Sequence, residues 1–443
     1  MALGKRKTEQ QELWIATTDL PKSPGHPFYR QLNQLLAESK FDDWLDQLCR
    51  PYYAAVMGRP SIPPGVYFRM ILVGYFEGIG SQRGIAWRCS DSRSLAEFLG
   101  VPADEATPDH SSLTRSHQRL PLAIHEQVFV FVLKIADGKK LLKGKTVAVD
   151  STTLEANAAM KSIERKDTGE DWKAYLTRLA KEAGIENPTD EELRRFDKKR
   201  TDKKVGNDDW QSTTDSESRI AKMKDGTTHL AYKAEHVVDL GSDLLLSATI
   251  TPANHGDAET LCDSLSQAQL NLQAAGSAAE IKEVVADKGY HKASTLELAD
   301  DLGWRTYIPE PKHTYRNRWT DKPAGQQAAV IGNRRRVRGQ RSKKLQRLRS
   351  ELCERTFAHI CETGGARRTW LRGLLKVSKR YLLQAAARNL GLIMRKLFKM
   401  GTPRGLQACG DLFWALYLAI RTCWSRYWAH RAIMTKVFLL RFG

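Results

Sequence analysis

The sequence lacks the segments that would insert the protein into a membrane or direct its export. No run reaches the roughly 18 apolar residues that a membrane span requires. The two longest candidates, at 128–135 and 412–420, are short, and Lys134 interrupts the first. The opening residues MALGKRKTEQQELW carry charges but no apolar core, so we expect no signal peptide. The sequence therefore predicts a cytoplasmic protein with no membrane partner.

The cysteine pattern disfavours two further classes of protein. The seven cysteines include no C-x-x-C pair, and their number is odd. This pattern argues against a zinc ribbon and against a disulfide framework, and it fits a reducing compartment. Three histidines, His229, His236 and His291, could suggest a zinc set. We interpret them instead as core or surface residues.

Positive charge is what the sequence has in excess. Its 443 residues include 70 Lys plus Arg against 51 Asp plus Glu, a formal net charge of +19. So large a surplus repels itself in the folded state and is usually retained for a polyanionic partner. Nucleic acid is the first candidate, and an anionic membrane surface is the second. With 41% hydrophobic residues, the chain can also build a packed core, and its length predicts two or three domains.

The first part of the chain has the apolar spacing of helices. Phe28, Leu32 and Leu35 recur at helical intervals, and further helical patterns cover 67–76 and 124–135. We predict a tail over 1–26 and a helical domain over 27–140. The pattern alone does not distinguish a DNA-binding domain from a dimerisation domain.

From 141 to 400 the pattern changes to strands that alternate with helices. Strands are predicted at 146–150, 229–240, 244–250, 281–286 and 304–308, and helices at 257–274 and 294–302. This alternation predicts an α/β sheet, in which ligands bind near the carboxyl ends of the strands. Asp150 and Asp287 each end one of the predicted strands. The charged segment at about 160–225 is predicted to be an insertion with its own helices or a mobile arm.

A basic stretch follows the last predicted strand. Between 312 and 349 the chain has thirteen Lys or Arg and one acid, Asp321, which gives +12 over 38 residues. A solvated loop is the usual outcome for a charge run, but a concentration this high near carboxylates favours DNA contact. Neutralising Arg334, Arg335 and Arg336 is then expected to reduce the salt dependence of binding. A basic, aromatic tail is predicted over 401–443.

The carboxylates predict metal chemistry on a phosphodiester. Two divalent ions about 3.5–4 Å apart can activate an attacking oxygen and stabilise a leaving one. Mg²⁺ and Mn²⁺ prefer oxygen ligands, which carboxylates supply. Two strand-end aspartates and a glutamate on a later helix would make such a site.

Three segments resemble the catalytic blocks of bacterial insertion-sequence transposases of the DDE type. They are TVAVDSTTLEANA (146–158), VVADKGYH (284–291) and Glu354-Arg355-Thr356-Phe357. The resemblance implies a ribonuclease-H-like fold, a mixed sheet flanked by helices and preceded by an all-helical domain. It makes Asp150, Asp287 and Glu354 the catalytic and metal-binding residues, with two Mg²⁺ ions (Mn²⁺ as an alternative) per site.

The third carboxylate has alternatives. Related transposases often place an Arg four residues before the glutamate and a Lys seven after it, and here those positions are Ser350 and Cys361. Glu351 would have Arg347 in the upstream position, and Glu362 is a further candidate.

The resemblance also implies the activity and the partners. We predict cleavage at element ends followed by strand transfer to target DNA, by a homodimer when DNA is bound, in association with the nucleoid. Two alternatives are a metal-dependent endonuclease without strand transfer and a catalytically dead DNA-binding protein descended from a transposase. The residues predicted to contact DNA are Lys288, Tyr290, Arg334, Arg335, Arg336, Arg338, Lys343, Lys344, Arg367, Arg368 and Arg372.

Overall fold

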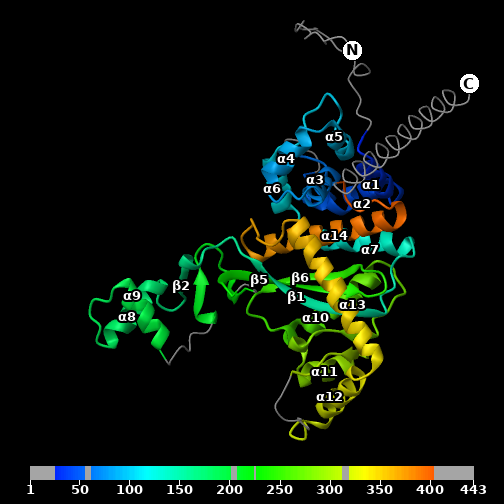
Figure 1. Cartoon of the computed structure of the whole chain (residues 1–443). Coiled ribbons are helices and arrows are strands. Elements are labelled where there is room, and N and C mark those ends of the chain that lie inside the picture. Colours follow the sequence, from blue (N-terminus) through cyan, green and yellow to red (C-terminus); the bar gives the residue numbers. More distant parts are fainter. Residues whose placement is uncertain (1–24, 55–60, 201–206, 224–225, 312–318, 404–443) are drawn as a thin grey trace, which may run out of the picture.

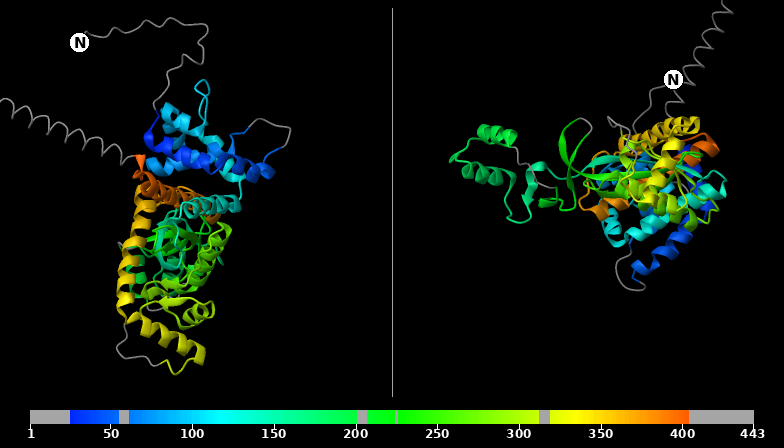
Figure 2. Two further views of the ribbon diagram at one scale, coloured as in Figure 1. Left: turned by 90° about the vertical axis from the view of Figure 1, so that its right-hand side faces the viewer. Right: turned by 90° about the horizontal axis from the view of Figure 1, so that it is seen from below.

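The structure is a computed structural model, and it describes residues 25–54, 61–200, 207–223, 226–311 and 319–403 (Figures 1 and 2). The predicted tails at 1–26 and 401–443 lie almost wholly outside the described residues. No helix in the described ranges is long and apolar enough to cross a membrane.

Seven helices precede the first strand. α3 is apolar on nearly all sides and is buried at the centre of this helical region, while α1 buries Phe28, Leu32 and Leu35 against its neighbours. His26 caps α1 by accepting a hydrogen bond from the backbone N–H of Phe28. The bounds are α1 Pro27–Glu38, α2 Phe41–Cys49, α3 Pro64–Glu77, α4 Gln82–Ser90, α5 Arg93–Leu99, α6 His110–Arg119 and α7 Leu122–Gly138.

A six-stranded mixed sheet follows the helical region. β1 pairs with β5 in antiparallel orientation and with β7 in parallel orientation, and β7 pairs in parallel with β8. β4 and β6 both pair with β5 on the side away from β1. The bounds are β1 Thr146–Glu155, β4 Arg219–Lys222, β5 Thr228–Asp239, β6 Leu245–Pro252, β7 Glu283–Val285 and β8 Arg305–Tyr307.

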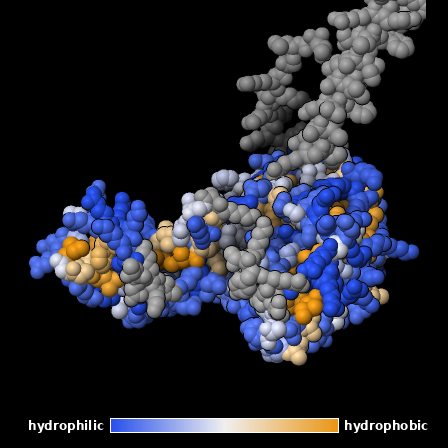
Figure 3. All heavy atoms as spheres, turned by 60° about the horizontal axis from the view of Figure 1, so that its bottom comes forward, coloured by the Kyte–Doolittle hydropathy of each residue, from blue (hydrophilic) through white to orange (hydrophobic). Residues whose placement is uncertain are grey.

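An arm extends from the sheet between β1 and β5, as Figure 1 shows on its left. It contains α8 (Trp172–Glu182) and α9 (Asp190–Lys199) beside the two-stranded sheet of β2 (Ile163–Arg165) and β3 (Trp210–Ser212). The segment for which an insertion with its own helices or a mobile arm was predicted thus contains two helices. Figure 3 shows orange, hydrophobic side chains on the arm and where it meets the body, on a surface that is otherwise mostly hydrophilic.

Helices cover both faces of the sheet. α10 (Asp257–Ala274) packs against β5 and β6, and α11 (Ala293–Asp301) and α12 (Ala324–Val337) pack near β8. α13 (Gln340–Phe357) crosses β7, β1 and β5 on the other face and continues into the π-helix η6 (Ala358–Thr363).

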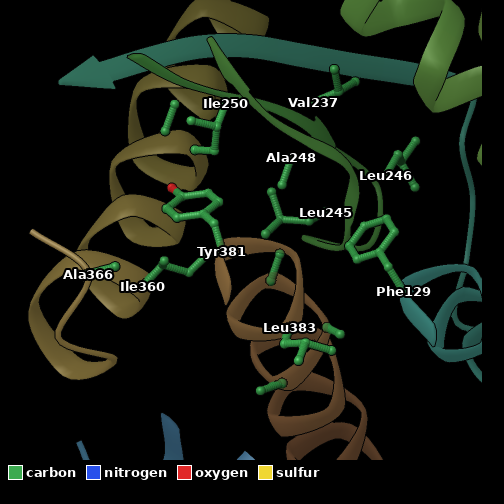
Figure 4. Packing of buried hydrophobic residues seen from close by; sticks show 14 of the residues in the cluster. Phe129, Val237, Leu245, Leu246, Ala248, Ile250, Ile360, Ala366, Tyr381 and Leu383 are labelled. Carbon is green, nitrogen blue, oxygen red and sulfur yellow. The ribbon is translucent and has the colours of Figure 1, made fainter. Parts of the chain in front are cut away.

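The last helix joins the helical region to the sheet. α14 (Leu374–Phe398) packs against α7, α3 and β6. Its Tyr381 lies among Ile360, Ile250 and Leu245, as Figure 4 shows. Its buried Asn389 exchanges two hydrogen bonds with the backbone of Leu245, at 3.0 and 2.8 Å. The apolar packing and this backbone tie make the sheet and the helical region share one core.

The predicted fold class is confirmed, because a mixed sheet flanked by helices follows an all-helical region. One prediction about the sheet is wrong. Asp150 does not end its strand, since β1 continues for five residues to Glu155. The parallel pairing with β7 stops at Ala148, but the antiparallel pairing with β5 continues along the whole length. The β-branched run at 146–149 could not reveal this extension because the pairing partner is distant in sequence.

Candidate active site and nucleic-acid interface

Asp150 and Asp287 lie at the same edge of the sheet. Ala148 of β1 is in register with Val285 of β7. Asp150 follows Ala148 by two residues within β1, and Asp287 follows Val285 by two residues just after β7. Because the two strands are parallel, both aspartates lie just beyond the carboxyl end of the paired segment. This edge is where the sequence placed the site.

Asp150 is held by two donors. Its Oδ1 accepts a hydrogen bond of 2.9 Å from the backbone N–H of Ser151, and its Oδ2 accepts one of 2.9 Å from Nη1 of Arg349 on α13. The two side chains of this ion pair are 24% and 16% exposed, so the pair is accessible from one side only. The Arg349 guanidinium thus neutralises a carboxylate that the sequence assigned to a metal.

Asp287 is organised by the turn that follows β7. Its Oδ1 accepts a hydrogen bond of 2.8 Å from the backbone N–H of Gly289 and caps the short 3₁₀ helix η5 (Lys288–Tyr290). A Cβ at Gly289 would stand 3.0 Å from Oδ1 of Asp287 and 3.0 Å from Oδ2 of Asp257. The glycine therefore leaves room for two carboxylates side by side.

The three candidate glutamates differ in their partners. Glu351 forms an ion pair with Arg355, and Glu362 forms one with Arg367. Glu354 accepts a hydrogen bond of 3.0 Å from Ser350, and no ion pair to it is found among the described residues. Among the three glutamates, Glu354 is thus the one whose carboxylate has no arginine partner among the described residues, and we keep it as the candidate.

Cys353 links Glu354 electrostatically to Asp150. Burial raises the pKa of the Cys353 thiol, and the negative charges of Asp150 and Glu354 raise it further. The negative charges of Asp150 on β1 and Glu354 on α13 therefore both raise the pKa of the buried Cys353 thiol.

The donor set suits a hard divalent cation, because Asp150, Asp287 and Glu354 offer only carboxylate oxygens. The described residues nevertheless contain no group of three His, Cys, Asp or Glu side chains that could hold a metal ion. The convergence of Asp150, Asp287 and Glu354 on a metal ion therefore stays a prediction. In physical terms, three uncompensated carboxylates repel, and here Arg349 and Ser350 occupy oxygens of two of them.

A buried polar network lies on the opposite face of the sheet from Asp150. Lys233, 5% exposed, contacts Glu235 at 3.4 Å and Asp257 at 2.8 Å, and Glu235 is 1% exposed. Asp257 also accepts a hydrogen bond of 2.8 Å from the Ser151 hydroxyl. The network therefore joins Ser151, the residue after Asp150, to Asp257 on α10, the helix that faces Asp287.

Tyr290 belongs to this network, which corrects its predicted contact with phosphate. Its ring is fully buried, and its hydroxyl donates a hydrogen bond of 3.0 Å to Oε2 of Glu235. Burial raises the pKa of the phenol well above its usual value, and the charges of Glu235 and Asp257 raise it further. Lys288, in contrast, is exposed as a DNA contact requires.

The histidines do not form a zinc site in the described chain. His236 is buried between Thr356 and Tyr381, which its two ring nitrogens contact at 2.8 and 2.7 Å. Burial lowers its pKa to about 3, so it stays neutral. His229 lies 3.8 Å from Glu155, and His291 lies 4.0 Å from Glu310.

Part of the basic stretch is used inside the fold. Arg334 forms an ion pair of 2.7 Å with Glu310, and Arg336 donates to the carbonyl and the hydroxyl of Thr306. Burial lowers the pKa of the Arg336 guanidinium. The expectation that Arg334, Arg335 and Arg336 all reach phosphates is therefore wrong for the first and third, because Glu310 holds Arg334 and Thr306 holds Arg336.

The other predicted DNA contacts have mixed environments. Arg335, Arg338, Lys343 and Lys344 are exposed on α12, α13 and their junction. Near η6, Arg367 pairs with Glu362, Arg368 lies 3.6 Å from Glu155, and Arg372 donates to the carbonyl of Asn157. Several exposed cations thus remain for a polyanion.

We expect neutralisation of Arg335, Arg338 and Lys343 together to flatten the slope of log K against log salt by about 2–3, since each phosphate contact contributes about 0.9 on duplex DNA. The loss should be similar for element ends and unrelated DNA, because phosphate contacts carry no base information. Binding isotherms at three or more salt concentrations, on both kinds of DNA, measure this slope.

The matched control is Arg334→Ala with Arg336→Ala, which removes two cations that the fold holds internally and should change the slope little. A larger slope change in that control than in the exposed variant would mean that the inward-facing arginines are the DNA contacts.

Sequence reasoning missed Arg349, Lys233, Glu235 and Asp257. Arg349 was counted only as part of a charge run, and nothing in its spacing identified Asp150 as its partner. Lys233 and Glu235 alternate with apolar residues on β5, which is the pattern of a strand with one solvated face. Their burial depends on α10, which lies elsewhere in the sequence.

Asp150 and Asp287 lie at one edge of the sheet, and Glu354 lies on α13, which crosses β7, β1 and β5. Comparison with protein families identifies the class of protein. Residues 142–390 match the family described as "Transposase DDE domain", and residues 18–119 match "Transposase domain (DUF772)". The chain belongs to the DDE transposase family. No match to an individual curated protein was found.

Proposed function

We propose that this transposase cleaves DNA at the ends of an insertion sequence and joins the freed ends to target DNA, in a reaction that depends on Mg²⁺ or Mn²⁺. The observation that supports the proposal is the position of Asp150 and Asp287, each two residues beyond the last register pair of the parallel strands β1 and β7, within the matched DDE domain. With Glu354 they supply the all-oxygen donor set that such ions prefer.

The chain's own residues have distinct roles in this proposal. Asp150, Asp287 and Glu354 would hold two divalent ions, which when bound activate the attacking oxygen and stabilise the leaving one. Arg349 orients Asp150 through its 2.9 Å contact, and Lys288 neutralises substrate phosphate.

The proposed reaction has two displacements at phosphorus. In the first, water attacks the phosphodiester at the element end and the bond to the 3′ oxygen breaks, which leaves a 3′-OH and a 5′-phosphate. In the second, this 3′-OH attacks a target phosphodiester and releases a target 3′-OH. No covalent bond between enzyme and DNA is needed.

Other proposals concern organisation. We propose that residues 27–140 form a DNA-binding or dimerisation domain and that residues 141–400 form a catalytic domain.

We also propose that a dimer assembles on two element ends, since the ends must be joined in concert. Light scattering of the DNA complex would reveal the dimer, and an active monomer on one end would refute it.

The test supplies a pre-cut 3′-OH end and target DNA to wild-type protein and to Glu354→Gln, Glu351→Gln and Glu362→Gln. Wild type should give strand-transfer product in Mg²⁺ and none in EDTA. Glu354→Gln should lose about 10³-fold or more, the effect of about 4 kcal/mol of lost transition-state stabilisation.

The other two glutamine variants are the matched controls and should retain activity, because their carboxylates are already paired with arginines. Loss of activity in Glu351→Gln or Glu362→Gln alone would reassign the third ligand. Cleavage without any joined product would favour the endonuclease alternative.

A further inference from the structure

A pocket of about 550 Å³ lies where the N-terminal helical region meets the segment between η6 and α14. One wall comes from α3, α4 and α6, and the other from 365–371 and the first turns of α14. Nothing in the proposed catalytic chemistry uses it. The residues that matter below are Arg83, Trp87, His117, Arg368, Trp370 and Arg380.

Two tryptophan rings at this pocket are turned to solvent. Trp87 is 68% exposed and Trp370 is 60% exposed, although indoles are usually buried. Gly80 makes room for Trp370, since a Cβ at Gly80 would stand 3.0 Å from the indole Nε1. Behind them Ile71 and Tyr381 are buried and supply apolar surface. The pocket therefore offers aromatic faces and an apolar floor.

The charge around these rings has one sign. The described lining residues include Arg83, Arg368 and Arg380 and no aspartate or glutamate. Arg380 donates to the carbonyl of Ile79 at 3.2 Å, and no ion pair to it is found among the described residues. The Arg368 guanidinium lies 5.8 Å from the centre of the Trp370 ring. Arg368 also lies 3.6 Å from Glu155, which is outside the lining, whereas no ion pair to Arg83 or Arg380 is found among the described residues. Guanidinium groups beside open aromatic faces suit a ligand that is both planar and anionic.

His117 is a buried lining residue of the pocket. The residue is 4% exposed, and its Nδ1 contacts the Tyr67 hydroxyl at 3.1 Å. Its Nε2 is buried and has no hydrogen-bond partner among the described residues. Burial lowers the pKa of His117 to about 3 despite an opposing effect from the Lys376 backbone, so the ring is neutral. A neutral imidazole can pair with a donor or an acceptor on a base edge.

β1 connects this pocket to the candidate active site. The strand that carries Asp150 ends at Glu155, whose backbone N–H and carbonyl bond to Arg367 and Thr369 at 3.0 and 2.8 Å. Five residues of strand span about 17 Å at roughly 3.3 Å each. One DNA substrate is long enough to occupy both places, since each step along a strand of a duplex is about 3.4 Å.

We propose that this pocket binds an unpaired nucleotide of the DNA substrate, with its base against Trp370 or Trp87 and its phosphate beside Arg368 or Arg83. The inference rests on the proposed function, because it takes DNA to be the substrate. It adds a site for single-stranded DNA that is separate from the carboxylates. A paired base cannot enter, since its faces are covered by its neighbours in the stack.

The test measures binding in EDTA, so that no chemistry occurs. The probe is a duplex with a single-stranded extension of about six nucleotides, a length within the range of known single-strand sites. The extension carries 2-aminopurine, whose fluorescence falls when it stacks on an aromatic ring. The reference is the same duplex with a blunt end.

Wild type should quench the probe and bind it more tightly than the blunt duplex. Trp370→Ala and Trp87→Ala should each raise Kd for the extended probe by about fivefold or more, the effect of losing one base–aromatic stack. Trp370→Phe keeps a ring and should restore most of the quenching. Arg368→Ala should also weaken binding. The matched controls are Trp172→Ala and Arg178→Ala on α8 of the arm, where Trp172 is 38% exposed.

The proposal would be overturned if three tryptophan variants bound and quenched the extended probe equally while circular dichroism showed each to be folded. These variants are Trp370→Ala, Trp87→Ala and Trp172→Ala. So would equal loss of affinity for the extended and the blunt probe. A wild-type protein that quenches the probe in EDTA but never cuts in Mg²⁺ would refute the proposed function and leave the pocket in place. If the wild-type protein cuts DNA normally in Mg²⁺ but does not quench the probe, the nucleotide pocket is refuted and the proposed function stands.

Discussion

Replacement of Asp150 or Asp287 by alanine is expected to lower cleavage and strand transfer by about 10³-fold or more while leaving DNA binding largely unchanged. The loss corresponds to about 4 kcal/mol or more, which is what a ligand to a catalytic metal can supply. Binding should survive because affinity comes mainly from phosphate contacts elsewhere. The measurements are product formation in Mg²⁺ and binding isotherms at one fixed salt concentration.

Asp263→Ala is the matched control, because Asp263 is exposed on α10. It should behave as wild type in both assays. Near-normal cleavage by Asp150→Ala or Asp287→Ala would show that the two-aspartate site is wrong. Loss of both cleavage and binding would point to unfolding, which thermal denaturation of the same variants distinguishes.

Lys233→Met is expected to destabilise the protein by about 3–5 kcal/mol. It removes the cation from a buried network and leaves Glu235, which is 1% exposed, without its charge partner. The midpoint of urea denaturation should fall accordingly. Lys173→Met is the control, since Lys173 and Asp190 form a pair whose side chains are 68% and 70% exposed. Its expected effect is within about 1 kcal/mol.

A second substitution separates charge from packing. Lys233→Met with Glu235→Leu removes both charges and should recover part of the lost stability, because an apolar pair of similar volume is often tolerated where a lone buried charge is not. If the double variant is no more stable than the single one, the loss comes from packing or from the hydrogen bonds to Thr260 and Ser264.

The sequence predicted those parts of the fold whose signals are local. The helix at 257–274 was predicted with the bounds that α10 has, because its apolar residues recur on one face over five turns. The position of Asp287 directly after a strand was also predicted, since the apolar run that precedes it is a local signal. The end of β1 at Glu155 was not predicted, because the last residues of this strand pair with β5, which is distant in sequence.

What the sequence could not predict was which charges the fold uses internally. Arg334, Arg335 and Arg336 are adjacent and chemically identical, yet the first and third are held by Glu310 and Thr306. The same limit applied to Asp150, whose Arg349 partner is 199 positions away. Polar contacts between distant segments depend on packing geometry, and no periodicity in a single sequence encodes them.

The arm has a consequence for how the protein folds. β1 and β5 are neighbours in the sheet, but Glu155 and its partner Ala231 are separated by the whole arm. Closing a longer loop costs more entropy, about 0.6 kcal/mol for each doubling, and pairings distant in sequence form slowly. The local contact of α8 with α9 can form first, and pairing of β2 with β3 then draws the two ends of the segment together. An arm that folds early would then act as a kinetic aid to assembly of the strand that carries Asp150.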